Sequence, residues 1–295
     1  MGQYSRRQFL QLSGIALIST KFPPFSFPDA PIYYGRALQA IPLYTLKNLG
    51  SKVAGNLWPD SIMPIYSADD DWYHVPGGYV KRVMMQPMTR YEPSPYPQTQ
   101  ALPFWAEVAA PVAPIRQWCA ADAPLVTRIG HGGVARIIDS LPGSREGMLW
   151  YGVQTNHNEL LGWSQAAFWQ PVQENTSPTS RPLLEIDQNL QLLTAYNEGE
   201  RVLQALVSTG LEMIPGHYPV TGRQLAGLPL NLPGHSHAFH GVPWRIQFGA
   251  VYELSGAYWH NSFGSPMLGP TVQVPPFLAS WLYGWLGDGG MISVS

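Results

Sequence analysis

The residues best suited to chemistry lie in the last third of the chain. His235, His237 and His240 form an H-x-H-x-x-H pattern, and imidazole nitrogens at such short spacing can supply metal ligands. No carboxylate pair and no second cysteine accompanies them, and Pro and Gly residues flank the run. Two interpretations stay open: weak candidate metal ligands, or a loop of surface or hydrogen-bonded histidines. Because a complete ligand set is missing, we predict that the protein needs no cofactor.

Hydroxyl side chains near His260 form a second group. Ser255, Ser262 and Thr271 are its neighbours along the chain, and a hydroxyl beside an imidazole is the pairing that serine hydrolases use. A threonine hydroxyl needs a strong, aligned base before it can act as a nucleophile. No acidic residue within sequence reach could orient His260. These residues therefore give one alternative for catalysis rather than a defined site.

Cys119 is the only cysteine of the chain, so a disulfide within the chain is impossible. A lone cysteine can be a nucleophile, but this one has no histidine close by and lies in an Ala-rich, apolar stretch. That context favours a small buried hydrophobic residue.

The composition limits the elements that position these residues. The 295 residues suggest two or three domains. Gly 29 and Pro 29, together with Trp 11 and Tyr 15, favour short strands and tight turns over long helices. The net charge is -2 with the cations scattered, which argues against a nucleic-acid groove. We therefore predict a mainly β protein that does not bind nucleic acid.

The N-terminus carries a twin-arginine pair. Arg6 and Arg7 precede a short, weakly apolar run, a pattern typical of a Tat-type export signal. The alternative is a basic tail that leads into an ordinary helix. We predict that residues 1–30 are a Tat-like signal and linker, and that the protein works outside the cytoplasm in the cell envelope. If the N-terminus is not cleaved, it would keep the protein near the membrane.

Two segments repeat the same order of aromatic, glycine and Gln-Pro landmarks, which suggests two copies of a small β module. The first copy has Trp72 to Val75, Gly78 to Val80 and Gln86 to Met88; the second has Trp150 to Val153, Gly162 to Ser164 and Gln170 to Val172. A Trp-Tyr strand before a Gly-Tyr-Val strand resembles bacterial SH3-like barrels. We assign modules to 31–95 and 100–176. Their aromatic side chains would either line a shallow groove for a peptide or glycan, or simply fill a small barrel.

The sequence pattern changes from residue 183 onwards. Residues 183–210 predict two strands joined by a turn at 197–199, and the apolar spacing over 276–286 predicts a helix with one apolar face. Pro276 suits the first turn of that helix, because no amide donor is needed there.

Residues 183–288 resemble the catalytic domain of the L,D-transpeptidases of the YkuD type, which cross-link peptidoglycan stems through a cysteine acyl-enzyme. The most specific motif is the Y-W-H-N-x-F-G-x-P run at 258–266, and the tryptophan-containing helix follows it. The resemblance implies a β-sandwich domain over 181–290 with a C-terminal helix, placed after the two modules. It also implies a substrate cleft, whose candidate binding residues are Trp244, Tyr258, Trp259, His260 and Asn261.

The chain departs from that family where the chemistry lies. Thr271 stands where the family has its nucleophilic cysteine, and Ser255 stands where it has the histidine base. A thiol ionises far more readily than a hydroxyl, and serine cannot act as the base. Pro270 also lacks the backbone N–H that could stabilise an oxyanion. We predict that Thr271 and Ser255 are inert.

These observations predict an exported envelope protein that has lost catalysis and binds peptidoglycan stem peptides or another envelope polymer. The alternative is an active acyl transferase or hydrolase that uses a non-cysteine nucleophile or a metal. A third possibility is a purely structural protein whose cleft is filled. A groove that reaches Thr271 would favour binding.

Overall fold

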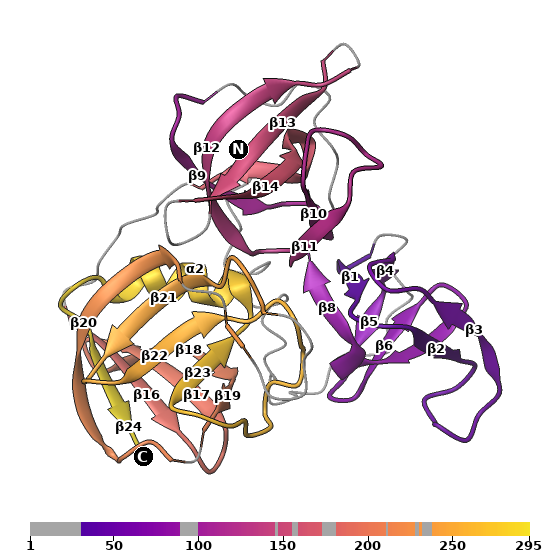
Figure 1. The fold of residues 1–295 in the computed structure, drawn as a ribbon. Coiled ribbons are helices and arrows are strands. Elements are labelled where there is room, and N and C mark those ends of the chain that lie inside the picture. Colours follow the sequence, from indigo (N-terminus) through magenta and orange to yellow (C-terminus); the bar gives the residue numbers. More distant parts are fainter. Residues whose placement is uncertain are drawn as a thin grey trace.

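A computed structural model describes residues 31–88, 100–144, 147–154, 159–172, 181–210, 212–227, 230–231 and 238–295. The twin-arginine segment lies outside this part of the chain. The protein is mainly β, as the composition predicts, and the described residues contain one α-helix, α2 (Pro276–Leu286). Within these ranges no helix is both long and apolar enough to cross a membrane. Figure 1 shows three groups of strands that follow one another along the chain.

The first unit contains two antiparallel sheets, with strand orders β4-β1-β8 and β3-β2-β7-β6-β5. Its elements are β1 (Tyr33–Ala37), β2 (Ile41–Tyr44), β3 (Val53–Leu57), β4 (Ile62–Ile65), β5 (Ser67–Ala68), β6 (Trp72–Val75), β7 (Gly78–Lys81), the 3-10 helix η1 (Arg82–Met84) and β8 (Met85–Met88). Alternating inward side chains form a small core around Tyr73, Ile41 and Ile65.

The second unit is one seven-stranded sheet with the order β11-β10-β14-β13-β12-β9-β15. Its elements are β9 (Phe104–Val108), β10 (Val112–Arg116), β11 (Leu125–Gly130), β12 (Val134–Pro142), β13 (Leu149–Gln154), β14 (Leu160–Gln165), the 3-10 helix η2 (Ala166–Phe168) and β15 (Trp169–Pro171). Its core contains Ile115, Ile129 and Ile137, and it extends to Tyr258 of the third unit.

The duplicated landmarks of the sequence occupy equivalent places in the two units. In each, a hairpin leads through one 3-10 turn into a last strand that pairs with the first strand: β8 with β1, and β15 with β9. Gly78 is the first residue of β7 and Gly162 is the third residue of β14, the second strand of each hairpin, and their φ angles are 152° and 156°. A Cβ at either position would collide with a backbone carbonyl, of Tyr44 or of Arg116. Both positions therefore require glycine.

The third unit is a nine-stranded sheet that folds over on itself, in the order β18-β17-β16-β24-β20-β21-β22-β23-β19. Its strands are β16 (Pro182–Asp187), β17 (Leu192–Asn197), β18 (Glu200–Leu206), β19 (Ser208–Thr209), β20 (Gly216–Ala226), β21 (Pro243–Phe248), β22 (Tyr252–Gly256), β23 (Thr271–Val274) and β24 (Met291–Val294). The start of β20 pairs with β24 and its later part with β21. This produces the two layers that a β-sandwich requires.

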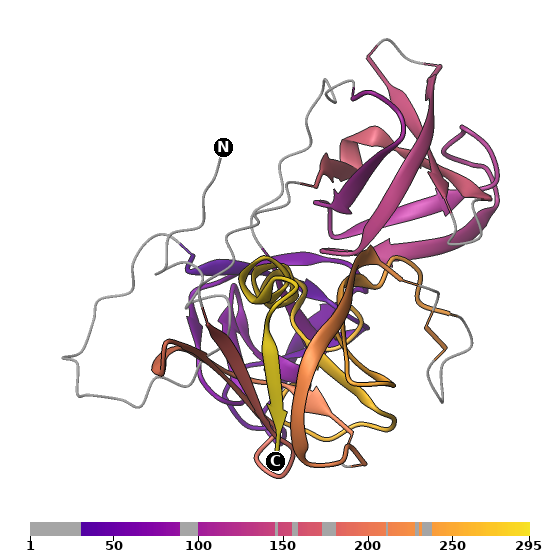
Figure 2. The same ribbon diagram turned by 90° about the vertical axis from the view of Figure 1, so that its left-hand side faces the viewer.

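A single core fills the space between these layers. It combines Leu184 and Ile186 of β16, Ile246 of β21 and Val272 of β23 with the apolar face of α2. Phe277 of α2 packs against this core and also against the core of the first unit; Figure 2 shows α2 nearly end-on beside the strands of that unit. The helix begins at Pro276, as the sequence predicts.

Two expectations for this unit need correction. Residues 183–210 contain three strands and the short β19 instead of two strands, because a turn at 188–191 divides the first run. The turn at 197–199 does join β17 to β18. A boundary at residue 290 would omit β24, although this strand lies between β16 and β20 in the middle of the sheet.

Candidate functional site

The two residues at the family's cysteine and histidine positions lie on neighbouring parallel strands. Thr271 opens β23 opposite Glu253 of β22, and Ser255 lies opposite Gln273. Since side chains alternate across a strand and Val272 belongs to the core, all four point to the other, polar face of the sheet. The register displaces Thr271 from Ser255 by two residues along the strands.

The hydroxyl of Thr271 has no base beside it among the described residues. Its Oγ1 lies 3.9 Å from Sδ of Met267, and a thioether is a weak acceptor that cannot take up a proton. Thr271 is half-buried, whereas Ser255 is only 3% exposed. Activation of either hydroxyl would require an aligned base within hydrogen-bond distance, and the described residues place none there; that both are inert stays a prediction.

His260 is the imidazole nearest to this face, and both of its nitrogens are engaged. The backbone N–H of Ser262 donates to Nδ1 at 3.2 Å, and the Ser262 hydroxyl lies 3.1 Å from the same atom. Nδ1 is therefore unprotonated, so Nε2 carries the hydrogen and donates it to Oε1 of Gln273 at 2.7 Å. Burial lowers the pKa of His260, partly offset by the bond to Gln273, so the neutral ring is favoured.

Gln273 is a residue that the sequence interpretation missed. It is 1% exposed and orients His260, the role for which only acidic residues were considered. The available signal was its position two residues after Thr271, which places both side chains on one face of a strand. An amide orients the ring but does not stabilise an imidazolium as a carboxylate does.

The predicted binding residue Asn261 faces the first unit. Its Nδ2 lies 2.8 Å from the Met85 carbonyl, 3.0 Å from the Arg82 carbonyl and 3.2 Å from the Tyr73 hydroxyl. The residue is 3% exposed. Its amide is thus used to join two units of the chain.

Tyr258 and Trp259 face the second unit. Tyr258 is buried, donates its hydroxyl to the His240 carbonyl at 2.6 Å, and burial raises its pKa. Trp259 stacks on Phe239 with ring centroids 4.8 Å apart. The fifth predicted binding residue, Trp244, lies in the core against Tyr283. A direct role of these residues in ligand binding stays a prediction.

A polar junction joins all three units at this point. Arg36 of β1 donates to Asp60 and to Gln86, both at 2.8 Å, and also to the Tyr258 carbonyl at 3.4 Å. Gln86 in turn donates to the His131 carbonyl at 2.8 Å. Arg36 is 8% exposed. Because its cation is paired with Asp60 and hydrogen-bonded through Nε and Nη1, burial is tolerated.

The other chemical candidates are the three histidines and Cys119. His235 and His237 lie outside the described residues, and His240 is half-buried. No group of three His, Cys, Asp or Glu side chains that could hold a metal occurs in the described ranges. Cys119 is half-buried, and burial, with a smaller effect of Asp139, raises the pKa of its thiol. The reactive thiolate is therefore disfavoured.

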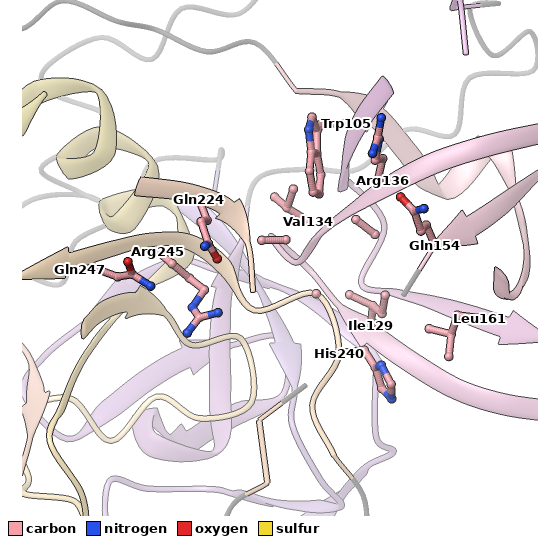
Figure 3. Close-up of a pocket in the computed structure, with 13 residues that line it drawn as sticks. Trp105, Ile129, Val134, Arg136, Gln154, Leu161, Gln224, His240, Arg245 and Gln247 are labelled. Carbon is pink, nitrogen blue, oxygen red and sulfur yellow. The ribbon is translucent and has the colours of Figure 1, made fainter. Parts of the chain in front are cut away.

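A cavity of about 450 Å³ lies between the second and third units. Figure 3 shows Trp105, Arg136 and Gln154 on one side, with Gln224, Arg245 and Gln247 on the other. Thr271 and Ser255 do not line it. Sequence analysis missed this cavity because its two walls come from separate units.

Comparison with known proteins gives only partial likenesses. No protein-family model and no curated protein sequence matches this chain. An Enterococcus faecium L,D-transpeptidase structure is 16% identical, covers 40% of this chain and 50% of its own, and has a TM-score of 0.33. A Stackebrandtia nassauensis L,D-transpeptidase is 16% identical, covers 42% of this chain and 60% of its own, and has a TM-score of 0.33. One from Mycobacterium smegmatis is 13% identical, covers 54% of this chain and 98% of its own, and has a TM-score of 0.34. This chain thus spans between half and three fifths of the first two proteins, and likeness of this degree assigns no activity.

Proposed function

We propose that this chain is an exported cell-envelope protein that binds peptidoglycan stem peptides or a related envelope polymer and does not catalyse acyl transfer. The claim that the protein does not catalyse acyl transfer rests on the environment of Thr271. Among the described residues, the one hydrogen-bond contact of its hydroxyl is to a thioether sulfur, and the imidazole of His260 has its acceptor nitrogen taken by a backbone N–H. Without a base, a threonine hydroxyl stays protonated at neutral pH.

The binding part rests on the sequence. The Y-W-H-N-x-F-G-x-P run resembles the peptidoglycan-acting family, and the twin-arginine pair favours export. The two modules, which we propose to be SH3-like, add exposed aromatic surface, since Trp58 of the first and Trp118 of the second are 77% and 52% exposed. Such rings give flat apolar surfaces with polar edges, on which sugars and peptides can pack.

One contact favours the alternative of a hydroxyl-based enzyme. The Ser262 hydroxyl lies 3.1 Å from Nδ1 of His260, and Gln273 holds the opposite nitrogen. This order of groups matches that of a catalytic triad, with an amide in the place of the acid. The Ser262 backbone N–H competes for the same nitrogen, so the arrangement is better explained as a local turn contact.

The test uses the full chain and separates the two parts of the proposal. Co-sedimentation with purified sacculi should retain the protein above a control protein of similar charge, and no retention would contradict the binding part. Incubation with stem tetrapeptides, followed by mass spectrometry, should give neither an acyl-enzyme nor a cross-linked product. A product that Thr271→Val or Ser262→Ala abolishes would establish the hydroxyl-based enzyme, and one that a chelator abolishes would establish metal-assisted chemistry.

A further inference from the structure

The cavity between the second and third units has one wall built on three adjacent strands. Arg136 of β12 lies opposite Trp105 of β9 and opposite Gln154 of β13. Directly opposed residues project from the same face of a sheet, so an aromatic ring, a guanidinium and an amide stand side by side. Arg136 is half-buried, and it takes part in none of the ion pairs found among the described residues.

The facing wall comes from β20 and β21 of the third unit, where Gln224 lies opposite Arg245. Arg245 forms an ion pair with Glu253 through one terminal nitrogen. Its Nε is buried and has no acceptor among the described residues. Gly227 lets the guanidinium lie this close to the backbone, since a Cβ there would collide with it. A buried donor without a partner is costly, so this N–H needs an acceptor from a ligand or from water.

Among the described residues, Arg136 is the lining cation that no ion pair neutralises, since Arg245 is paired with Glu253. The lining includes two arginines and no Asp or Glu, together with the amides of Gln154, Gln224 and Gln247. Guanidinium groups in partly dehydrated sites bind carboxylates through paired N–H bonds. Amide side chains both donate and accept, which matches the groups of a peptide backbone. The volume falls in the range of pockets that hold small organic ligands.

We propose that this cavity is a binding site for a short peptide with a free carboxylate. Arg136 receives the carboxylate, the glutamine amides bind the peptide groups, and Trp105 packs against the apolar part of the ligand. The site is distinct from the position of Thr271. The inference does not depend on the proposed function, because ligand binding here and acyl transfer at Thr271 are measured separately.

The test is calorimetric titration of the full chain with N-acetyl-trialanine and with its C-terminal amide, two probes that differ only in the carboxylate charge. The acid should bind. The amide should bind with an affinity at least about tenfold lower, because one charge-assisted contact is lost. Arg136→Gln should weaken binding of the acid by a similar factor, and added salt should do the same. The exposed Arg201 provides the matched control, so Arg201→Gln should leave binding unchanged.

Three results would overturn the proposal: no binding of the acid, equal binding of acid and amide, or unchanged binding by Arg136→Gln. Arg136→Lys guards against misfolding, since it retains the charge and removes only the planar fork. It should bind with intermediate affinity. Thermal unfolding of each variant, compared with that of the parent protein, shows that the fold is intact.

Discussion

Two segments of the third unit, only a few residues apart, differ sharply in how they are held. In the segment 258–261, Tyr258 and Asn261 are buried at the contacts with the other two units, and Asn261 alone contacts three acceptors in the first unit. Thr271, on the polar face of the same unit, is half-buried and contacts one sulfur atom. The first segment resembles the transpeptidase motif and the second does not. The comparison teaches that Tyr258 and Asn261 of this motif have a structural role in joining the units, whereas any further role stays a prediction.

The largest effect is expected at the first segment. Asn261→Leu would remove an amide that contacts three polar atoms of the first unit, of which the Met85 carbonyl and the Tyr73 hydroxyl are buried, and unsatisfied buried polar groups are costly. We expect the free energy of unfolding to fall by about 2–4 kcal/mol, measured by urea denaturation. The exposed Asn231 serves as control, with no comparable loss for Asn231→Leu. If both variants were equally stable, the junction would not account for the motif.

A smaller, pH-dependent effect is expected at His131, whose carbonyl belongs to the same junction. Burial, and then the charge of Arg36, lowers the pKa of His131 to about 4 from an ordinary 6.5. The folded state therefore binds a proton less readily than the unfolded state, and stability is lost as the pH falls from about 6.5 through 4. Because His131 is half-buried, we expect the free energy of unfolding to fall by about 1–2 kcal/mol across this pH range.

The variant His131→Asn isolates this contribution. Its amide can still donate to the carbonyls of Ala109 and Ala110, which Nδ1 of His131 faces at 3.1 and 3.3 Å, but it does not titrate. The free energy of unfolding should thus vary less with pH over this window than in the parent protein. His260 remains in both proteins and contributes in the same direction. Identical pH dependence of the two proteins would show that His131 is not responsible.

The smallest effect is expected at the second segment. Thr271→Val removes a hydroxyl whose contact is a weak acceptor, so the free energy of unfolding should change by about 0.5 kcal/mol or less. Thr209 offers the matched comparison, because it is fully buried and donates to the Gly210 carbonyl at 2.7 Å. Thr209→Val should lower the free energy of unfolding by about 1 kcal/mol more than Thr271→Val does. A loss at Thr271 as large as at Thr209 would reveal an interaction that the geometry does not contain.

Local features of this chain were accessible from its sequence. The helix beginning at Pro276, the turn that leads into β18 and the duplicated hairpins each depend on residues close in the chain: a proline, a glycine and alternating apolar side chains. The mainly β class follows from the same signals.

The site could not be predicted in this way, because its contacts depend on tertiary register. Asn261 contacts residues that precede it by more than 170 positions, and no local pattern specifies them. The bond between His260 and Gln273 requires knowing that β22 and β23 run parallel. The cavity needs two walls from separate units, so neither half alone carries a recognisable motif.

The place of β24 has a consequence for how the protein is made. This strand lies between β16 and β20 and runs parallel to β16, although β17 through α2 separate the two in the chain. Until residues 291–294 have left the ribosome, the sheet consists of two halves with open edges, and such edges invite association with other chains. We therefore expect the nascent third unit to require a chaperone until β24 is available for pairing, which the two preceding modules do not.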